Sequence, residues 1–125
     1  MQSVDVRGDV LQVSYAAGDA KYGVIFSIDG RGTLTWHVPA GYTGGSRAAA
    51  PLDTRGKVIL PTAYELDDAP RFERFFLVYG AAPFEIADIE RIVRALAAQP
   101  STADRTTLSL PSGLGQYSFV LNKQG

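Results

Sequence analysis

The chain has 125 residues, of which 46% are hydrophobic and 20% are charged, and these are ordinary values for one soluble globular domain. Twelve lysines and arginines oppose thirteen aspartates and glutamates, so the formal net charge is -1, and no basic run occurs. This balance excludes the electrostatic footprint of a nucleic-acid-binding protein and of a polybasic membrane-surface protein.

The first half of the chain has the pattern of short strands separated by turns. Residues 9–15 alternate between apolar and polar side chains, which predicts a half-buried strand. Residues 21–29 and 33–38 are two further alternating runs around "GRG", and this arrangement predicts a hairpin. Residues 47–52 predict a weak edge strand, and residues 57–61 a short strand that stops at a proline.

The second half contains the one predicted helix. The run "RFFLVYG" (74–80) is typical of a strand that is covered on both faces. Residues 83–100 carry apolar side chains at helical spacing and charged side chains on the opposite face, which predicts an amphipathic helix that packs on the sheet. Residues 106–111 and 115–123 predict the last two strands. We therefore expect one mainly β domain over residues 1–125, an antiparallel β-sandwich of seven or eight strands with one late helix.

Few residues could support nucleophilic or metal chemistry. The chain has no cysteine, so disulfides, thiol nucleophiles and thiolate metal sites are excluded. His37 is the only histidine, and no Gly-x-Ser-x-Gly motif presents a serine to it. Because Trp36 and His37 point to opposite faces of a strand, we expect His37 to lie away from the main core as an ordinary polar strand residue.

The stretch "YELDDAPRFERFF" (64–76) has the densest group of carboxylates and arginines in the chain. Calcium takes several oxygens around one point, and paired carboxylates can serve as acid and base in a hydrolase. Such a site would use Glu65, Asp67, Asp68 and Glu73. These acids do not have the spacing of the EF-hand calcium loop, which needs a glycine at its bend.

The same stretch also has the composition of a solvated turn that leads into a buried strand. Asp67 and Asp68 are turn-forming residues ahead of Pro70, and Arg71 and Arg74 are near enough in sequence to neutralise the acids. We favour this structural interpretation and expect no cofactor. Calcium at the four acids stays open as the alternative.

Two motifs point to a known family. The hairpin "GVIFSIDGRGTLTWHVP" is similar to a DGxGxVxxxxP pattern, and "GKVILPTAYELDDAPRFERFFLVYG" is similar to LPxxxxLDDxPGxExF. Together they resemble a bacterial family of domains of unknown function that occurs in anti-sigma-factor-like membrane proteins and beside caspase-like peptidases. The chain departs from the family at Arg71, where a glycine is usual. The matching positions are Asp29, Gly30, Gly32, Leu60, Pro61, Leu66, Asp67, Asp68, Pro70, Glu73 and Phe75.

The resemblance implies an accessory interaction module, and it assigns no catalytic residue to this chain. It also implies that the domain is the soluble part of a longer, membrane-anchored signalling protein and lies on the extracytoplasmic (periplasmic) side of the membrane. A cytoplasmic location stays open. No stretch of the sequence reaches 18 apolar residues, so we expect no membrane contact by this chain itself.

We therefore predict a non-enzymatic binding or sensor module whose partner is a protein or a small ligand. The expected contacts are Tyr42, Tyr64 and Arg71, because a glycine-rich loop and the acidic turn would expose them. The first alternative is a calcium- or carboxylate-dependent hydrolase centred on Glu65, Asp67 and Asp68. The second is a carbohydrate-binding module, which would need several exposed aromatic rings on one strand face.

Overall fold

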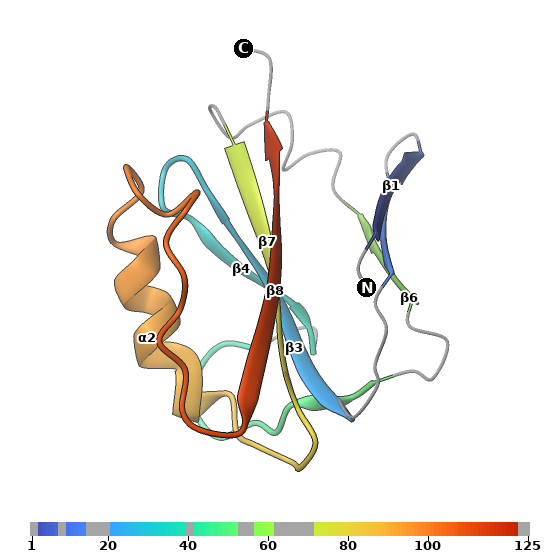
Figure 1. Cartoon of the computed structure of the whole chain (residues 1–125), viewed down its shortest axis with the longest axis vertical. Helices are drawn as coiled ribbons and strands as arrows, with labels where there is room; N and C mark the ends of the chain where they lie inside the picture. Colours follow the sequence, from blue (N-terminus) through green and yellow to red (C-terminus); the bar gives the residue numbers. More distant parts are fainter. Residues whose placement is uncertain are drawn as a thin grey trace.

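The computed structural model describes residues 3–7, 10–14, 21–39, 42–52, 57–61 and 72–122 (Figure 1). Side chains are described for residues 21–39, 42–52 and 72–120. Within these ranges the chain forms eight strands and one helix. The predicted fold class, mainly β with antiparallel strands and one late helix, is confirmed.

Five strands form the main sheet, and every pairing in it is antiparallel. The strand order is β4-β3-β7-β8, and β5 pairs with one end of β3. The strands are β3 (Tyr22–Asp29), β4 (Leu34–Val38), β5 (Ala50–Pro51), β7 (Phe72–Gly80) and β8 (Leu114–Asn122). β7 therefore lies in the interior of the sheet, and β8 lies at its edge.

The hairpin of β3 and β4 is confirmed, and its turn is built by Asp29. The Asp29 carboxylate accepts hydrogen bonds from the backbone N–H groups of Arg31 and Thr33, both at 2.9 Å. Gly32 completes the turn with a φ of 84°, a conformation that side chains with a Cβ rarely adopt. The Asp29 side chain thus sets this turn locally, and the Gly30 N–H also donates to the Phe72 carbonyl of β7 at 3.0 Å.

β7 is buried except at the half-buried Tyr79, in agreement with the prediction for residues 74–80. Phe76 and Val78 contribute to the larger core, which includes Phe26 of β3. Phe75 and Leu77 point to the opposite face of the sheet, where they form a smaller cluster. Both faces of the central strand are therefore covered by apolar side chains, which explains the continuous apolar run.

The helix α2 (Ala87–Ala97) covers one face of the main sheet (Figure 1). Its buried side chains are Ile89, Val93, Leu96 and Ala97, which belong to the larger core. The helix is shorter than the predicted 83–100, because residues 84–86 form backbone hydrogen bonds with residues 47–49 instead. In the described part of the chain, no helix has the length and apolar character needed to cross a membrane.

A second, smaller sheet contains β1 (Ser3–Arg7), β2 (Val10–Ser14) and β6 (Lys57–Pro61) in the order β1-β2-β6. Figure 1 places this sheet on the side of the main sheet that is opposite α2. This arrangement is compatible with the predicted sandwich, and the sandwich itself stays a prediction. β2 and β6 agree with the predicted strands, whereas the sequence analysis missed β1.

The strand predicted at 106–111 is wrong. This segment is extended but pairs with no strand through its backbone within the described residues. The side chain of Gln116 holds it instead: Gln116 Nε2 donates to the Leu108 carbonyl at 2.7 Å, and the Leu108 N–H donates to Gln116 Oε1 at 3.1 Å. One amide side chain takes the place of a strand partner.

Candidate functional site

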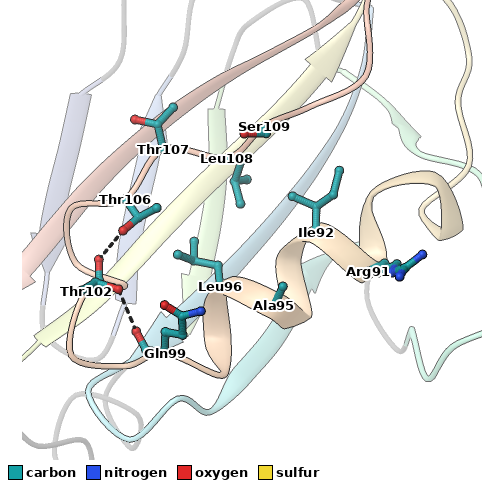
Figure 2. Close-up of a pocket in the computed structure, with 10 residues that line it drawn as sticks. All are labelled: Arg91, Ile92, Ala95, Leu96, Gln99, Thr102, Thr106, Thr107, Leu108 and Ser109. Carbon is teal, nitrogen blue, oxygen red and sulfur yellow. Dashed lines mark hydrogen bonds between the residues drawn. The ribbon is translucent and has the colours of Figure 1, made fainter.

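A groove of about 390 Å³ runs between α2 and the segment 102–109 that follows it (Figure 2). Its apolar lining comes from Ile92, Ala95 and Leu96 on the helix and from Leu108 on the segment. Polar side chains surround these residues, namely Arg91, Gln99, Thr102, Thr106, Thr107 and Ser109. An apolar groove with a few polar groups around it is the usual chemistry of a ligand-binding site.

Hydrogen bonds fix the wall of the groove that lies across from α2. The Thr106 hydroxyl donates to the Thr102 carbonyl at 2.9 Å, and the Thr102 hydroxyl donates to the Gln99 carbonyl at 3.3 Å (Figure 2). Further along the same wall, Gln116 holds Leu108 at both its N–H and its carbonyl. The wall is thus tied to the end of α2 and to β8, so the groove is built before any ligand arrives.

Arg74, on strand β7 of the main sheet, supports this wall. Its guanidinium donates to the carbonyls of Ala103 at 2.9 Å and Thr106 at 2.6 Å, and to the Ser118 hydroxyl at 2.8 Å. It also lies 4.4 Å from the ring centre of Phe76. Burial lowers the pKa of Arg74, and the nearby carboxylate of Asp104 acts in the opposite direction.

The opposite face of the sheet carries a small polar network. The Ser27 hydroxyl donates to Glu73 Oε2 at 2.8 Å, and Ser27 Oγ lies 2.8 Å from His37 Nε2. The His37 ring also stacks on Phe75, with ring centres 5.5 Å apart. His37 therefore lies on the second face, as the sequence analysis expects.

The order of this network differs from that of a serine hydrolase. In a catalytic triad the histidine lies between serine and carboxylate and accepts the serine proton. Here the single proton of Ser27 is directed to Glu73, so His37 Nε2 has to be the donor toward Ser27. Ser27 is also 0% exposed, and Glu73 is 2% exposed. The geometry favours a network that holds β3, β4 and β7 in register.

His37 gives this network a pH dependence that can be measured. Burial lowers the pKa of His37 from 6.5 to about 4, so the unfolded chain binds this proton more readily than the folded chain does. The contribution of His37 to stability is therefore complete above pH 6.5, and we expect it to be lost as the pH falls from 6.5 toward 4.

The measurement is urea unfolding between pH 7 and pH 4 for the wild type and for His37→Gln, which cannot titrate. The free energy of unfolding should fall more steeply for the wild type than for the variant across this window. The carboxylates are common to both proteins, so their effect cancels in the comparison. Equal slopes would show that His37 is not held in its neutral form.

The expected exposure of Tyr42 is wrong. Its side chain is 6% exposed, and its ring makes an edge contact with Trp36, with ring centres 5.1 Å apart. Its hydroxyl donates to Glu90 Oε1 at 2.6 Å and is 3.1 Å from the Gly45 carbonyl. Burial, together with the hydrogen bond to Glu90, raises the pKa of Tyr42 to about 12. Tyr42 holds its loop against α2 and does not present its ring to solvent.

The other predicted site residues have two different outcomes. Glu73 lies on β7, buried beside Ser27. Nowhere in the ranges that the structure describes do three or more potential metal-ligating side chains come together. The remaining predicted residues, Tyr64, Glu65, Asp67, Asp68 and Arg71, lie outside the described residues, so the contact and calcium hypotheses at those positions stay predictions.

The sequence analysis missed the groove and the role of Arg74 in supporting it. The guanidinium of Arg74 points to the backbone of Ala103 and Thr106, whereas the acids at positions 65, 67 and 68 lie outside the described residues. The alternation of β7 contained the signal: Arg74 shares a face with Phe72 and Phe76, and an arginine on a buried face needs partners there. The groove had no comparable signal, since two separate segments form it.

The comparisons with known proteins add no relative. No protein-family model matches the chain, and neither does any curated protein or solved structure. The resemblance to the domains of anti-sigma-factor-like proteins stays a prediction.

Proposed function

We propose that this chain is a non-enzymatic binding module that takes a protein segment or a small ligand in the groove between α2 and residues 102–109. The observation that carries the proposal is the groove itself, with its apolar lining of Ile92, Leu96 and Leu108 and its polar rim. Apolar groups supply affinity in such a site, and the surrounding hydroxyl, amide and guanidinium groups supply orientation. The family resemblance adds the expectation of a sensor or interaction domain in a bacterial envelope protein.

The groove is suited to binding a ligand more than to catalysing a reaction of it. Its polar groups are threonine and serine hydroxyls, an amide and the guanidinium of Arg91, and none of these is a general base at neutral pH. The polar network of Ser27, His37 and Glu73 lies on the other face of the sheet. These placements support binding over hydrolysis, and the calcium- or carboxylate-dependent hydrolase at residues 65–68 is kept as the alternative.

The carbohydrate-binding alternative has less support. Sugar-binding surfaces need aromatic rings with a free face, but the rings on the second face of the sheet stack on one another. Phe75 and Phe119 have ring centres 5.2 Å apart, and Tyr79 and Tyr117 have ring centres 5.3 Å apart. Their stacked faces are already used within the protein.

The groove can be tested with a displayed library of random peptides selected on the wild type. Ala95 is exposed on α2 and lines the groove, so Ala95→Arg should fill the groove without disturbing the core. Ala87→Arg is the matched control, since Ala87 is also exposed on α2 and is not among the residues that line the groove. Enriched peptides should bind the control as well as the wild type and should lose at least tenfold in affinity for Ala95→Arg. Peptides that bind all three proteins equally, or no enrichment, would contradict the proposal.

A further inference from the structure

The edge strand β8 has an outer side that is paired with no other strand in the described part of the chain. It is nine residues long, "LGQYSFVLN", and contains no charged residue and no proline. Proteins normally protect an edge strand by short length, charge, proline or a bulge, because its free N–H and carbonyl groups attract another strand. β8 has none of these four devices.

The opposite edge of the same sheet is protected. β4 has five residues, its pairing with β3 shifts register between Ile25 and Phe26, and Pro39 follows it directly. The two edges of this one sheet therefore differ: the β4 edge has features that hinder pairing with another strand, and the β8 edge lacks them. A long edge strand that lacks these devices offers its free N–H and carbonyl groups to another strand.

Three backbone hydrogen bonds establish which groups of β8 point outward. Gly30 N donates to Phe72 O, Lys21 N donates to Gly80 O, and Asp29 N donates to Thr33 O. They show that the even-numbered residues of β7 are bonded to β3, so its odd-numbered residues are bonded to β8. Since odd residues pair with odd residues in this register, Gln116, Ser118 and Val120 direct their N–H and carbonyl groups away from the sheet.

We propose that β8 pairs with β8 of a second copy of this chain, antiparallel and around a two-fold axis at Ser118. Ser118 is the midpoint of the strand, it is exposed, and its backbone groups point outward. An antiparallel pair centred there forms hydrogen bonds between Ser118 and its own counterpart, and between Gln116 of one copy and Val120 of the other. The two main sheets become one continuous sheet.

The second copy is the occupant that the sequence of β8 fits. In an antiparallel pair around Ser118 every residue lies opposite a residue of the same segment, so an uncompensated charge near Ser118 would lie close to its own counterpart. β8 carries no charge from Leu114 to Asn122. On the second face, Tyr117 of one copy lies opposite Phe119 of the other, and aromatic cross-strand pairs stabilise a sheet. A closed two-fold pair also occupies the β8 edge of each copy, which leaves no free β8 to which a third copy could bind.

The test is the mass of the protein in solution, measured by sedimentation equilibrium over a concentration series. Ser118→Pro removes the outward N–H and places a ring where the second copy would bind, while the hydrogen bonds from β8 to β7 are kept. Ser118→Ala is the control, because it loses the same hydroxyl contact with Arg74 but keeps the N–H. Val120→Pro removes a second outward N–H and is the substitute if Ser118→Pro does not fold by circular dichroism.

We expect the wild type and Ser118→Ala to reach twice the chain mass of 13.4 kDa, and the proline variant to stay at that mass at the same concentrations. A wild type that is monomeric throughout the series would overturn the proposal. This would hold even if an unrelated peptide were the strand that pairs with β8. A proline variant that folds and still dimerises would overturn it too, since the copies would then meet elsewhere. This inference does not depend on the groove, so the peptide experiment and the mass measurement can fail separately.

Discussion

Replacing Arg74 with leucine is expected to lower the free energy of unfolding by about 3 kcal/mol. Arg74 is 6% exposed, and its guanidinium donates to two backbone carbonyls, those of Ala103 and Thr106, and to the Ser118 hydroxyl. Leucine fills part of the space but donates nothing, so the buried Ala103 carbonyl and the partly buried Thr106 carbonyl lose their partner. The cost of leaving these carbonyls unpaired exceeds what the additional apolar contact with Phe76 returns.

Urea unfolding monitored by circular dichroism measures this loss, and two further variants make it specific. Arg105→Leu removes an exposed arginine whose side chain is 67% accessible and pairs only with the neighbouring Asp104 among the described ion pairs, so it should cost under about 1 kcal/mol. Arg74→Lys should fall between the two, since an ammonium cannot reach three acceptors in the planar arrangement of a guanidinium. If Arg74→Leu lowers the free energy of unfolding no more than Arg105→Leu does, the hydrogen bonds of Arg74 are not a source of stability.

The loss should be visible at the groove as well as in global stability. Arg74 and Gln116 hold the same wall from two strands, one at Thr106 and the other at Leu108. Gln116 also directs its backbone toward the free edge of β8. The groove wall and the edge strand are therefore joined through one residue, although the two proposals about them are tested independently.

Elements whose conformation is set by residues close in sequence could be predicted from the sequence. The β3–β4 hairpin depends on an aspartate that bonds to residues two and four positions ahead, and such contacts leave a mark in a short window of sequence. The same holds for α2, whose buried residues recur at helical spacing. Its start was placed too early, because the backbone of 84–86 is bonded to residues 47–49 far along the chain.

Elements with a distant cause could not be predicted. The extended segment around Leu108 has the pattern of a strand, but a side chain from β8 occupies its backbone groups. Tyr42 lies in a glycine-rich stretch that looks solvated, yet Glu90 and Trp36 bury it from other elements. The groove depends on the distance between α2 and the segment after it, and no residue pattern encodes that distance.

The second large effect is expected at Gly32, where alanine should lower the free energy of unfolding by about 3 kcal/mol. Gly32 has a φ of 84°, and a Cβ at this position would lie 2.5 Å from the carbonyl oxygen of Ala97 at the end of α2. The backbone of either the hairpin turn or the helix would have to move. The matched control is Gly45→Ala, because Gly45 has a φ of 83° with no atom within 4 Å of the added Cβ.

The two variants share the cost of the left-handed backbone, about 1 kcal/mol, so the difference between them measures the contact between the turn and the helix. We expect thermal and urea unfolding to show a difference of about 2 kcal/mol, with Gly32→Ala the less stable. Equal losses would mean that α2 is not held against the hairpin at this point. The glycine in the turn would then serve only the turn, and the position of α2, which forms one side of the groove, would have to depend on its buried face alone.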